Sequence, residues 1–150
     1  MSTASLKKYF SAVVAKRLSE VEVNPQRSHQ HEFNGTQALK GILGLERRTQ
    51  IATLLYLSDE EELVRAQCKL TWYDAREADP VRSEHRLYFQ HNEVIDSANA
   101  DDLLILAIRP SGDILIAIAT EGSTREQQLQ WLFGVEPERD KPFTVSAIPE

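Results

Sequence analysis

Residues 101–119, DDLLILAIRPSGDILIAIA, constrain the fold of this chain more than any other segment. Two apolar runs of strand length flank a short polar stretch that contains Pro110 and Gly112. Proline and glycine favour a reversal of the chain, so the segment predicts a β-hairpin of two apolar strands. Neither run approaches the ~18 residues that a membrane-spanning helix needs.

A further strand is predicted by the alternation of apolar and polar residues in residues 63–73, LVRAQCKLTWY. Apolar and polar side chains take turns along it, with Val64, Ala66, Cys68, Leu70 and Trp72 on one face and Arg65, Gln67, Lys69, Thr71 and Tyr73 on the other. This period of two is typical of an antiparallel strand with one buried face. Residues 49–57 predict a strand before this one, and an acidic turn at 59–62 connects the two. Residues 84–90 predict a strand after it, beyond a polar loop at 74–83.

Three helices are predicted from capping residues and apolar spacing. Ser5 is a suitable N-cap, and the first helix should end near Glu20, with an apolar stripe of Leu6, Tyr9, Phe10, Val13, Val14 and Leu18. Thr36 should cap a short helix that ends at Gly44. Ser123 and Glu126 have the spacing of a capping box, which predicts a last helix that ends at Gly134.

These elements predict an α+β domain built on a curved, mostly antiparallel, partly closed sheet with helices at both ends. The chain has no βαβ rhythm and no glycine-rich phosphate loop. Residues 135–150 contain three prolines and no apolar period. We therefore expect a domain over residues 1–134, followed by a linker or arm over residues 135–150 that leads towards a further domain.

Composition limits the class of protein. A chain of 150 residues with 41% hydrophobic and 27% charged residues is typical of one globular domain. The single cysteine, Cys68, excludes an internal disulfide and suits a reducing compartment. The first ten residues lack an apolar signal core, so we expect a cytoplasmic protein that does not associate with membranes.

The net charge of −6 argues against general attraction to nucleic acid. The charge is uneven, however. Residues 1–57 contain eight lysines and arginines against four acidic residues, whereas residues 92–150 contain four against eleven. A local anion-binding face is therefore compatible with the acidic total, and we expect the first half of the chain to set it.

Two polar loops share a short pattern of Pro-x-Arg-Ser, which begins at Pro25 in one loop and at Pro80 in the other. Arginine offers a fork of five donors that suits a phosphate or a guanine edge, and glutamine and asparagine suit adenine. The candidate DNA contacts of the two loops are Arg27, Ser28, Gln30, His31 and Asn34 in the first, and Arg76, Arg82 and Ser83 in the second. The alternative is that both are ordinary turns with solvated arginines.

Cations and aromatic residues also interleave on the polar faces of two predicted strands. The candidates for DNA contacts there are Lys69, Tyr73, Arg86 and Tyr88, with Arg65 beside them. The alternative interpretation is a set of cross-strand ion pairs that involve Asp74 and Glu84.

Catalytic and metal centres have little support in the sequence. His29 and His31 with Glu32 lack a further clustered ligand, and His85 and His91 are isolated. Asp59, Gln67 and Lys69 loosely follow the layout of a magnesium-dependent nuclease, which keeps a stand-alone nuclease open as an alternative. No Gly-x-Ser-x-Gly motif of a serine hydrolase is present.

Four segments together resemble a known family. They are SLKKYFSAVVAKRLS, EVNPQRSHQHEFNG, WYDAREADPVRSEHRLYF and GSTREQQLQWLFG, and they are similar to the N-terminal region of EcoRII-like type II restriction endonucleases. ANADDLLILAI is also similar to a "GD" motif that opens a strand in such proteins. It departs from that motif because Ala100, Asp101 and Asp102 stand where glycine is usual.

The resemblance implies a DNA-recognition and regulatory domain with a pseudobarrel similar to plant B3 domains. The partners would be double-stranded DNA and a C-terminal catalytic domain, and a homo-oligomer is compatible with this. The residues of magnesium-dependent cleavage would belong to that catalytic domain, so none is assigned here and no cofactor is expected for this chain. The alternatives are the stand-alone nuclease and a protein-docking, autoinhibitory module.

Overall fold

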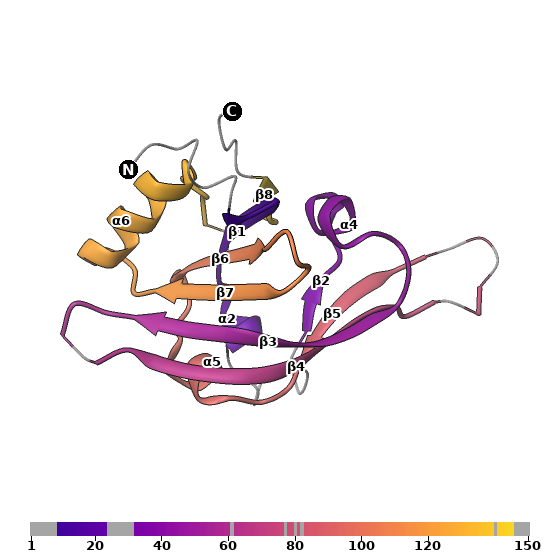
Figure 1. The fold of residues 1–150 in the computed structure, drawn as a ribbon, viewed down its shortest axis with the longest axis horizontal. Coiled ribbons are helices and arrows are strands. Elements are labelled where there is room, and N and C mark those ends of the chain that lie inside the picture. Colours follow the sequence, from indigo (N-terminus) through magenta and orange to yellow (C-terminus); the bar gives the residue numbers. More distant parts are fainter. Residues whose placement is uncertain are drawn as a thin grey trace.

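The computed structural model describes residues 9–23, 32–60, 62–76, 78–79, 81, 83–139 and 141–145. Within these ranges the strands are β1 (Ala12–Arg17), β2 (Glu32–Asn34), β3 (Arg48–Leu57), β4 (Val64–Asp74), β5 (His85–Phe89), β6 (Leu103–Ile108), β7 (Ile114–Ala119) and β8 (Thr144–Val145). The helices are α2 (Glu20–Val23), α4 (Gln37–Leu43), α5 (Glu93–Ser97) and α6 (Thr124–Phe133). Figure 1 shows their arrangement.

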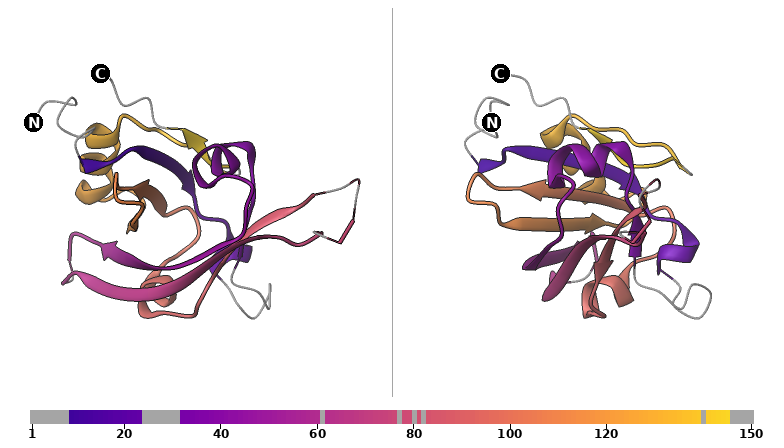
Figure 2. Two further views of the ribbon diagram at one scale, coloured as in Figure 1. Left: turned by 45° about the vertical axis from the view of Figure 1, so that its right-hand side comes forward. Right: turned by 90° about the vertical axis from the view of Figure 1, so that its right-hand side faces the viewer.

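All the strands named above belong to one sheet, in the order β2-β5-β4-β3-β7-β6-β1-β8. β3 and β7 pair in parallel, and every other pair is antiparallel. The sheet curls strongly, so that β6 and β7 stand above the long ribbon of β3 and β4 (Figure 2). The predicted α+β class and the curved, mostly antiparallel sheet are confirmed.

The predicted hairpin lies in the middle of this sheet. β6 is buried over its whole length, and β7 is buried except at Leu115. Gly112 occupies the turn with φ of 96°, a backbone conformation that glycine adopts without steric cost. The apolar runs that the sequence places around Pro110 are therefore the central strands of the fold.

The two faces of the sheet are covered differently. The inward face of β4 joins a large core inside the curl, in which Leu54, Trp72 and Leu104 are fully buried, and this confirms the alternation predicted for residues 63–73. On the outward face, Phe133 of α6 packs over β1, β6 and β7. Of the helices in the described ranges, none covers the outward faces of β2, β5 and β4 (Figure 1).

Two of the predicted helices are confirmed with their caps. The Thr36 side chain accepts a hydrogen bond from the Leu39 amide at the start of α4, and Gly44 ends that helix. Ser123 caps α6 in the same way through the Glu126 amide, and Gly134 ends α6 in a left-handed conformation. Within the described ranges, no helix has the length and apolarity to cross a membrane.

The predicted first helix is wrong over residues 12–17. Tyr9 is helical, but residues 12–17 form β1, which pairs with β6, and the chain is helical again only over residues 20–23. Val13 and Val14 are β-branched and fit a strand well. Pairing with β6 buries both of them on opposite faces of the sheet, and this tertiary burial outweighs the helical spacing of the apolar residues. Ser5 lies outside the described residues.

The loop before β6 explains how the fold tolerates the departure from the "GD" motif. Asp101 has a φ of 74°, so aspartate takes the left-handed conformation that glycine would take. The adjacent Asp102 carboxylate is buried and accepts hydrogen bonds from the Asn99 and Glu121 amides and from the Tyr56 hydroxyl, at 2.8, 3.0 and 2.9 Å. These three donors satisfy a charge that burial would otherwise destabilise.

The segment after α6 packs on the domain as far as it is described. Val135 and Phe143 are buried, and β8 pairs with β1 through Val14 and Ala15. The division into a domain over residues 1–134 and a linker or arm over residues 135–150 stays a prediction.

We expect the thiol of Cys68 to be unreactive in the folded protein. Cys68 points into the core, and burial raises the pKa of its thiol to about 11. Alkylating reagents attack the thiolate, so labelling at pH 8 should be slow without denaturant and fast in urea. Mass spectrometry of the alkylated chain measures this directly, because no other cysteine is present. Rapid labelling of the native protein would contradict the placement of β4.

Candidate nucleic-acid interface

Four of the predicted DNA contacts lie together on the outward face of β2, β5 and β4. The strand register places Asn34 opposite Arg86, and Arg86 opposite Tyr73. In the same way, Tyr88 lies opposite Thr71. Directly paired residues point to the same side of a sheet, so these side chains form one surface. Tyr88 is 43% exposed, and Asn34 is also exposed.

The two polar loops leave this surface at opposite ends of β5. The 75–84 loop leads directly into His85, the first residue of β5. The 24–31 loop leads into Glu32, which pairs with Tyr88 near the last residue of β5. The described residues of the β4–β5 connection project away from the body of the domain (Figure 1). In the sequence, a polar segment therefore adjoins this surface at each end of β5.

The root of the 75–84 loop is held by hydrogen bonds. The Asp74 carboxylate accepts hydrogen bonds from the backbone amides of Arg76 and Glu84, at 2.9 and 2.8 Å. Both bonds lower the pKa of Asp74, and the bond from Glu84 has the larger effect. The amide of Ala75 also donates to the Glu84 carbonyl at 2.7 Å. These bonds fix the direction in which the loop leaves β4, because both of its ends are tied to one carboxylate.

Glu84 pairs with two of the candidate arginines. Its carboxylate accepts from Nε of Arg76 at 3.0 Å and from Nη2 of Arg86 at 2.5 Å. Both bonds lower the pKa of Glu84, and the bond from Arg76 has the largest effect. The bond to Glu84 in turn raises the pKa of Arg86. Glu84 thus forms ion pairs as the alternative interpretation expects, but Arg86 lies only two residues from it along the chain and Arg76 belongs to the loop, so these are not the cross-strand pairs of that interpretation. Each pair occupies one donor of the guanidinium, and the remaining donors can still face a ligand.

A groove of about 520 Å³ opens between the two edges of the curled sheet. Its lining comes from three parts of the chain: Lys16, Arg17, Ser19 and Glu22 from β1 and α2, Glu32, Asn34 and Arg86 from β2 and β5, and Lys141, Pro142 and Phe143 after α6. Glu22 of α2, before the 24–31 segment, and Glu32 of β2, after it, both line this groove. The lining carries four basic and two acidic side chains, in a protein whose net charge is −6.

The basic side chains of the groove differ in how they are held. Lys16 pairs with Glu22 at 2.6 Å and lies 5.4 Å from the ring centre of Phe143, so it joins β1 to the segment after α6. Arg17 pairs with Glu126 on α6. Lys141 is exposed and makes no ion pair with any described residue. Lys141 is therefore the lysine of this groove with the greatest freedom to meet an anion.

A tyrosine on β4 and a glutamate on β2 form a side-chain hydrogen bond across β5. The hydroxyl of Tyr73 donates to Oε2 of Glu32 at 2.6 Å. Burial raises the pKa of Tyr73 to about 12, and the hydrogen bond to Glu32 adds to the effect. The guanidinium of Arg47 lies 5.8 Å from the centre of the Tyr73 ring. The phenol thus stays protonated and holds the carboxylate in one orientation.

The described structure places only some of the predicted site residues. Asn34, Tyr73, Arg86 and Tyr88 share the surface just described. Lys69 is exposed further along the same face of β4, and Arg76 and Ser83 lie at the root of the 75–84 loop. The remaining predictions lie outside the described residues: Arg27, Ser28, Gln30, His31 and Arg82.

Sequence reasoning missed Lys16, Lys141 and the role of Glu32. Lys16 was assigned to a helix, Lys141 to a linker, and Glu32 was considered only as a metal ligand. No local pattern marks these residues, because the groove forms only when β1, β2 and the segment after α6 meet. The one usable signal is the polar alternation of Glu32 and Asn34 around the buried Phe33.

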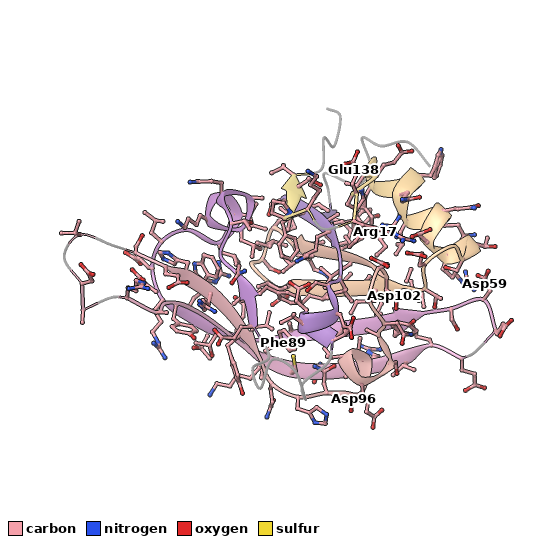
Figure 3. All side chains as sticks on the ribbon, turned by 180° about the vertical axis from the view of Figure 1, so that it is seen from behind. Arg17, Asp59, Phe89, Asp96, Asp102 and Glu138 are labelled. Carbon is pink, nitrogen blue, oxygen red and sulfur yellow. The ribbon has the colours of Figure 1, made fainter. Side chains whose placement is uncertain are left out.

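Asp59 lies away from Gln67 and Lys69, the other two residues of the nuclease alternative, because these pair with Thr53 and Ile51 whereas Asp59 follows the end of β3. Both oxygens of Asp59 accept hydrogen bonds from α6, at 2.9 Å from the Thr124 amide and 3.4 Å from the Arg125 amide. These bonds lower the pKa of Asp59, which lies at the end of β3 beside α6 (Figure 3). Among the described residues, no three histidine, cysteine or acidic side chains are grouped to hold a metal ion.

The described histidines have structural contacts. His85 is buried, stacks on Trp72 with ring centres 5.0 Å apart, and makes a 2.9 Å hydrogen bond between its Nε2 and the Leu45 carbonyl. Nε2 of His91 lies 2.8 Å from the Asp96 carboxylate on α5. His29 and His31 lie outside the described residues.

Comparison with known proteins gives a match among solved structures alone. No protein-family model matches this chain, and no curated protein matches it. The chain is similar to the crystal structure of the UbaLAI restriction endonuclease B3 domain with cognate DNA, at 14% sequence identity and a TM-score of 0.45. The match covers 96% of this chain and 92% of that chain.

Proposed function

We propose that this chain recognises double-stranded DNA in a sequence-specific way. The observation that carries the proposal is the surface of β2, β5 and β4 that bears Asn34 and Arg86, with the basic groove between the sheet edges beside it. A five-residue strand spans roughly 15 Å, which is comparable with the ~12 Å width of the major groove of DNA. The two ends of β5, which the polar segments of the sequence adjoin, are therefore about one major groove apart.

The side chains of this surface suit both kinds of DNA contact. Arginine, lysine, serine and backbone amides bind phosphate and fix the position of a duplex. Asparagine and arginine can also form paired hydrogen bonds to the base edges in the major groove. Asn34 and Arg86 are adjacent on the sheet and line the groove. The candidates Arg27, Gln30 and Arg82 belong to the loops that flank them.

The acidic total limits how the domain would bind. A net charge of −6 offers little general attraction to a polyanion, so most of the affinity should come from a matched site. Binding to unrelated duplexes should be weak and should depend on salt through the few phosphate contacts of the groove.

A finer proposal concerns the parent protein. The sequence resemblance supports an N-terminal recognition domain of an EcoRII-like type II restriction endonuclease in the cytoplasm. Its partner would be a C-terminal catalytic domain that carries the magnesium-dependent chemistry. The solved B3 domain was crystallised with cognate DNA, and the same class of partner is proposed here from the groove and loops of this chain.

Alanine at Arg27 or at Arg82 should weaken binding to a duplex selected from a random pool. If the arginine meets a guanine edge with two hydrogen bonds, the loss should be about 1–3 kcal/mol, with relaxed preference at one base pair. If it meets a phosphate, affinity should fall evenly across sequences, and the slope of log affinity against log salt should shrink by about one. Fluorescence anisotropy titrations of selected and scrambled duplexes measure both effects.

Arg125→Ala is the matched control, because Arg125 is exposed on α6 and its guanidinium contacts only Gln128 among the described residues, at 3.3 Å. Circular dichroism must show that each variant is folded. Equal affinity of the wild type for selected and scrambled duplexes would contradict the proposed function. Folded Arg27→Ala and Arg82→Ala variants that bind as the wild type does would remove the loops from the interface.

A further inference from the structure

Glu32 is an unusual residue for a surface that is proposed to meet DNA. It lines the groove between the sheet edges together with Lys16 and Arg86, yet it pairs with neither of them. Lys16 pairs with Glu22 at 2.6 Å, and Arg86 pairs with Glu84 at 2.5 Å. Among the described residues, Glu32 has no ion pair, although four basic side chains line the same groove.

The two oxygens of the Glu32 carboxylate differ in their contacts with the described residues. Oε2 accepts the hydroxyl of Tyr73 at 2.6 Å, a bond that reaches from β4 across β5 to β2. Oε1 has no hydrogen-bond partner among the described residues. The tyrosine therefore restrains the carboxylate of a groove-lining residue and leaves its second acceptor available to a ligand. A phenol kept protonated by burial is a dependable donor for this purpose.

A carboxylate in this position repels phosphate, so it would weaken binding unless it met a hydrogen-bond donor on the DNA. The donors on the base edges of the major groove are the exocyclic amino groups of cytosine and adenine. In adenine the amino group stands beside the acceptor N7, which would repel the carboxylate. In cytosine it stands beside a C–H group, so cytosine is the better match for an acceptor that cannot donate.

We propose that Glu32 is a specificity-determining residue that accepts a hydrogen bond from the N4 amino group of a cytosine in the major groove. Tyr73 is its positioning residue, because it acts through the carboxylate that it holds. The inference rests on the proposed function and deepens it, since it names one base that the domain reads and the residue that reads it.

The test uses the duplex that the wild-type chain selects from a random pool, with each base pair then substituted in turn. In the Glu32→Ala and Glu32→Gln variants, preference for one C·G pair should fall on the order of tenfold, and preference at the other positions should stay within about twofold. The glutamine variant should lose the preference because Tyr73 would hold the amide oxygen and turn the NH₂ group towards the cytosine amino group. The Tyr73→Phe variant should show a smaller loss at the same base pair.

A modified duplex isolates the hydrogen bond itself. Replacing the cytosine by a pyrimidin-2-one nucleotide removes only the N4 amino group. This change should weaken wild-type binding about tenfold and should have little further effect on Glu32→Ala, because the two changes remove the same bond. The control is Glu93→Gln, which makes the same change of side chain at an exposed position on α5 that does not line the groove.

The outcomes separate this inference from the function on which it rests. A wild-type chain that prefers no duplex would overturn both. A wild-type chain that selects a duplex, with folded Glu32→Ala and Glu32→Gln variants that keep every base preference, would overturn the role of Glu32 and leave the proposed function standing. A uniform rise in affinity for all duplexes, with preferences unchanged, would show that Glu32 only repels phosphate and would also overturn it.

Discussion

Replacement of Glu126 by alanine should destabilise the domain by about 3 kcal/mol, because it breaks a buried ion pair with Arg17. The side chains of Arg17 and Glu126 are only 12% and 8% exposed, and they join β1 to α6. The carboxylates of Glu121, Asp101 and Asp102 still act on Arg17, which keeps the loss at the lower end of the range for a broken buried pair. The second oxygen of Glu126 accepts the Gly122 amide at 3.0 Å, so the substitution also removes a bond at the start of the helix. The loss combines the broken ion pair with a weakened N-terminus of α6. Figure 3 shows Arg17 close to α6.

Chemical denaturation followed by circular dichroism measures this loss as a shift of the unfolding midpoint. The double variant Arg17→Met, Glu126→Leu should recover much of the stability, since it removes both charges and leaves apolar groups of similar size. Arg139→Ala is the comparison at the surface. Arg139 is 61% exposed and pairs with Glu121, so its loss should cost only about 0–1 kcal/mol. A Glu126→Ala protein as stable as Arg139→Ala would contradict a buried ion pair.

Replacement of Trp72 by alanine should cost about 3–5 kcal/mol and should also abolish binding to the selected duplex. Trp72 is fully buried on β4, and its indole nitrogen donates to the Gly44 carbonyl at 3.0 Å. Its ring stacks on His85, the residue at which the 75–84 loop enters β5. His85 in turn packs closely on Gly35, where an added Cβ would lie 2.4 Å from the His85 carbonyl oxygen. The cavity left by the indole would therefore loosen β2 and β5, which carry the proposed interface.

The Trp72→Phe variant separates packing from folding, because it keeps an aromatic ring and loses the hydrogen bond to Gly44. It should be destabilised by about 1–2 kcal/mol and should remain folded, with weaker DNA binding than the wild type. Trp131→Ala is the matched control, since Trp131 is 69% exposed on α6 and its loss should change neither property. The unfolding midpoint and the anisotropy titration are the two measurements. A stable Trp72→Ala protein that binds normally would refute the link between this packing and the interface.

Local sequence determined the elements whose signals lie within a few residues. The alternation of residues 64–73 identified β4 and its buried face, because side chains on a strand point alternately to its two sides. The Pro110–Asp113 turn identified the β6–β7 hairpin. Thr36 and Ser123 marked the first residues of two helices, because each side chain satisfies an amide that its own helix cannot. The α+β class follows from these elements together.

Elements that depend on a distant partner were beyond the sequence. Residues 12–17 have helical spacing of their apolar side chains, but pairing with β6 makes them a strand with two buried faces. β2 has only three residues and forms because β5 offers it an edge. The parallel pairing joins β3 to β7, although each of these strands belongs to a different hairpin in the sequence.

The candidate site likewise has a part that the sequence determined and a part that only the tertiary structure decided. The sequence by itself determined which residue types can meet DNA, because arginine, asparagine and tyrosine carry their donors wherever they lie. Only the tertiary structure decided which of them meet: it set Asn34 beside Arg86, bound Arg76 and Arg86 to Glu84, and brought Lys16 and Lys141 to one groove. It also bonded Glu32 to Tyr73 and, among the described residues, gave it no cationic partner. The physical reason is that hydrogen bonds and ion pairs form over a few ångströms in space, and the curl of the sheet fixes those distances between residues far apart in the chain.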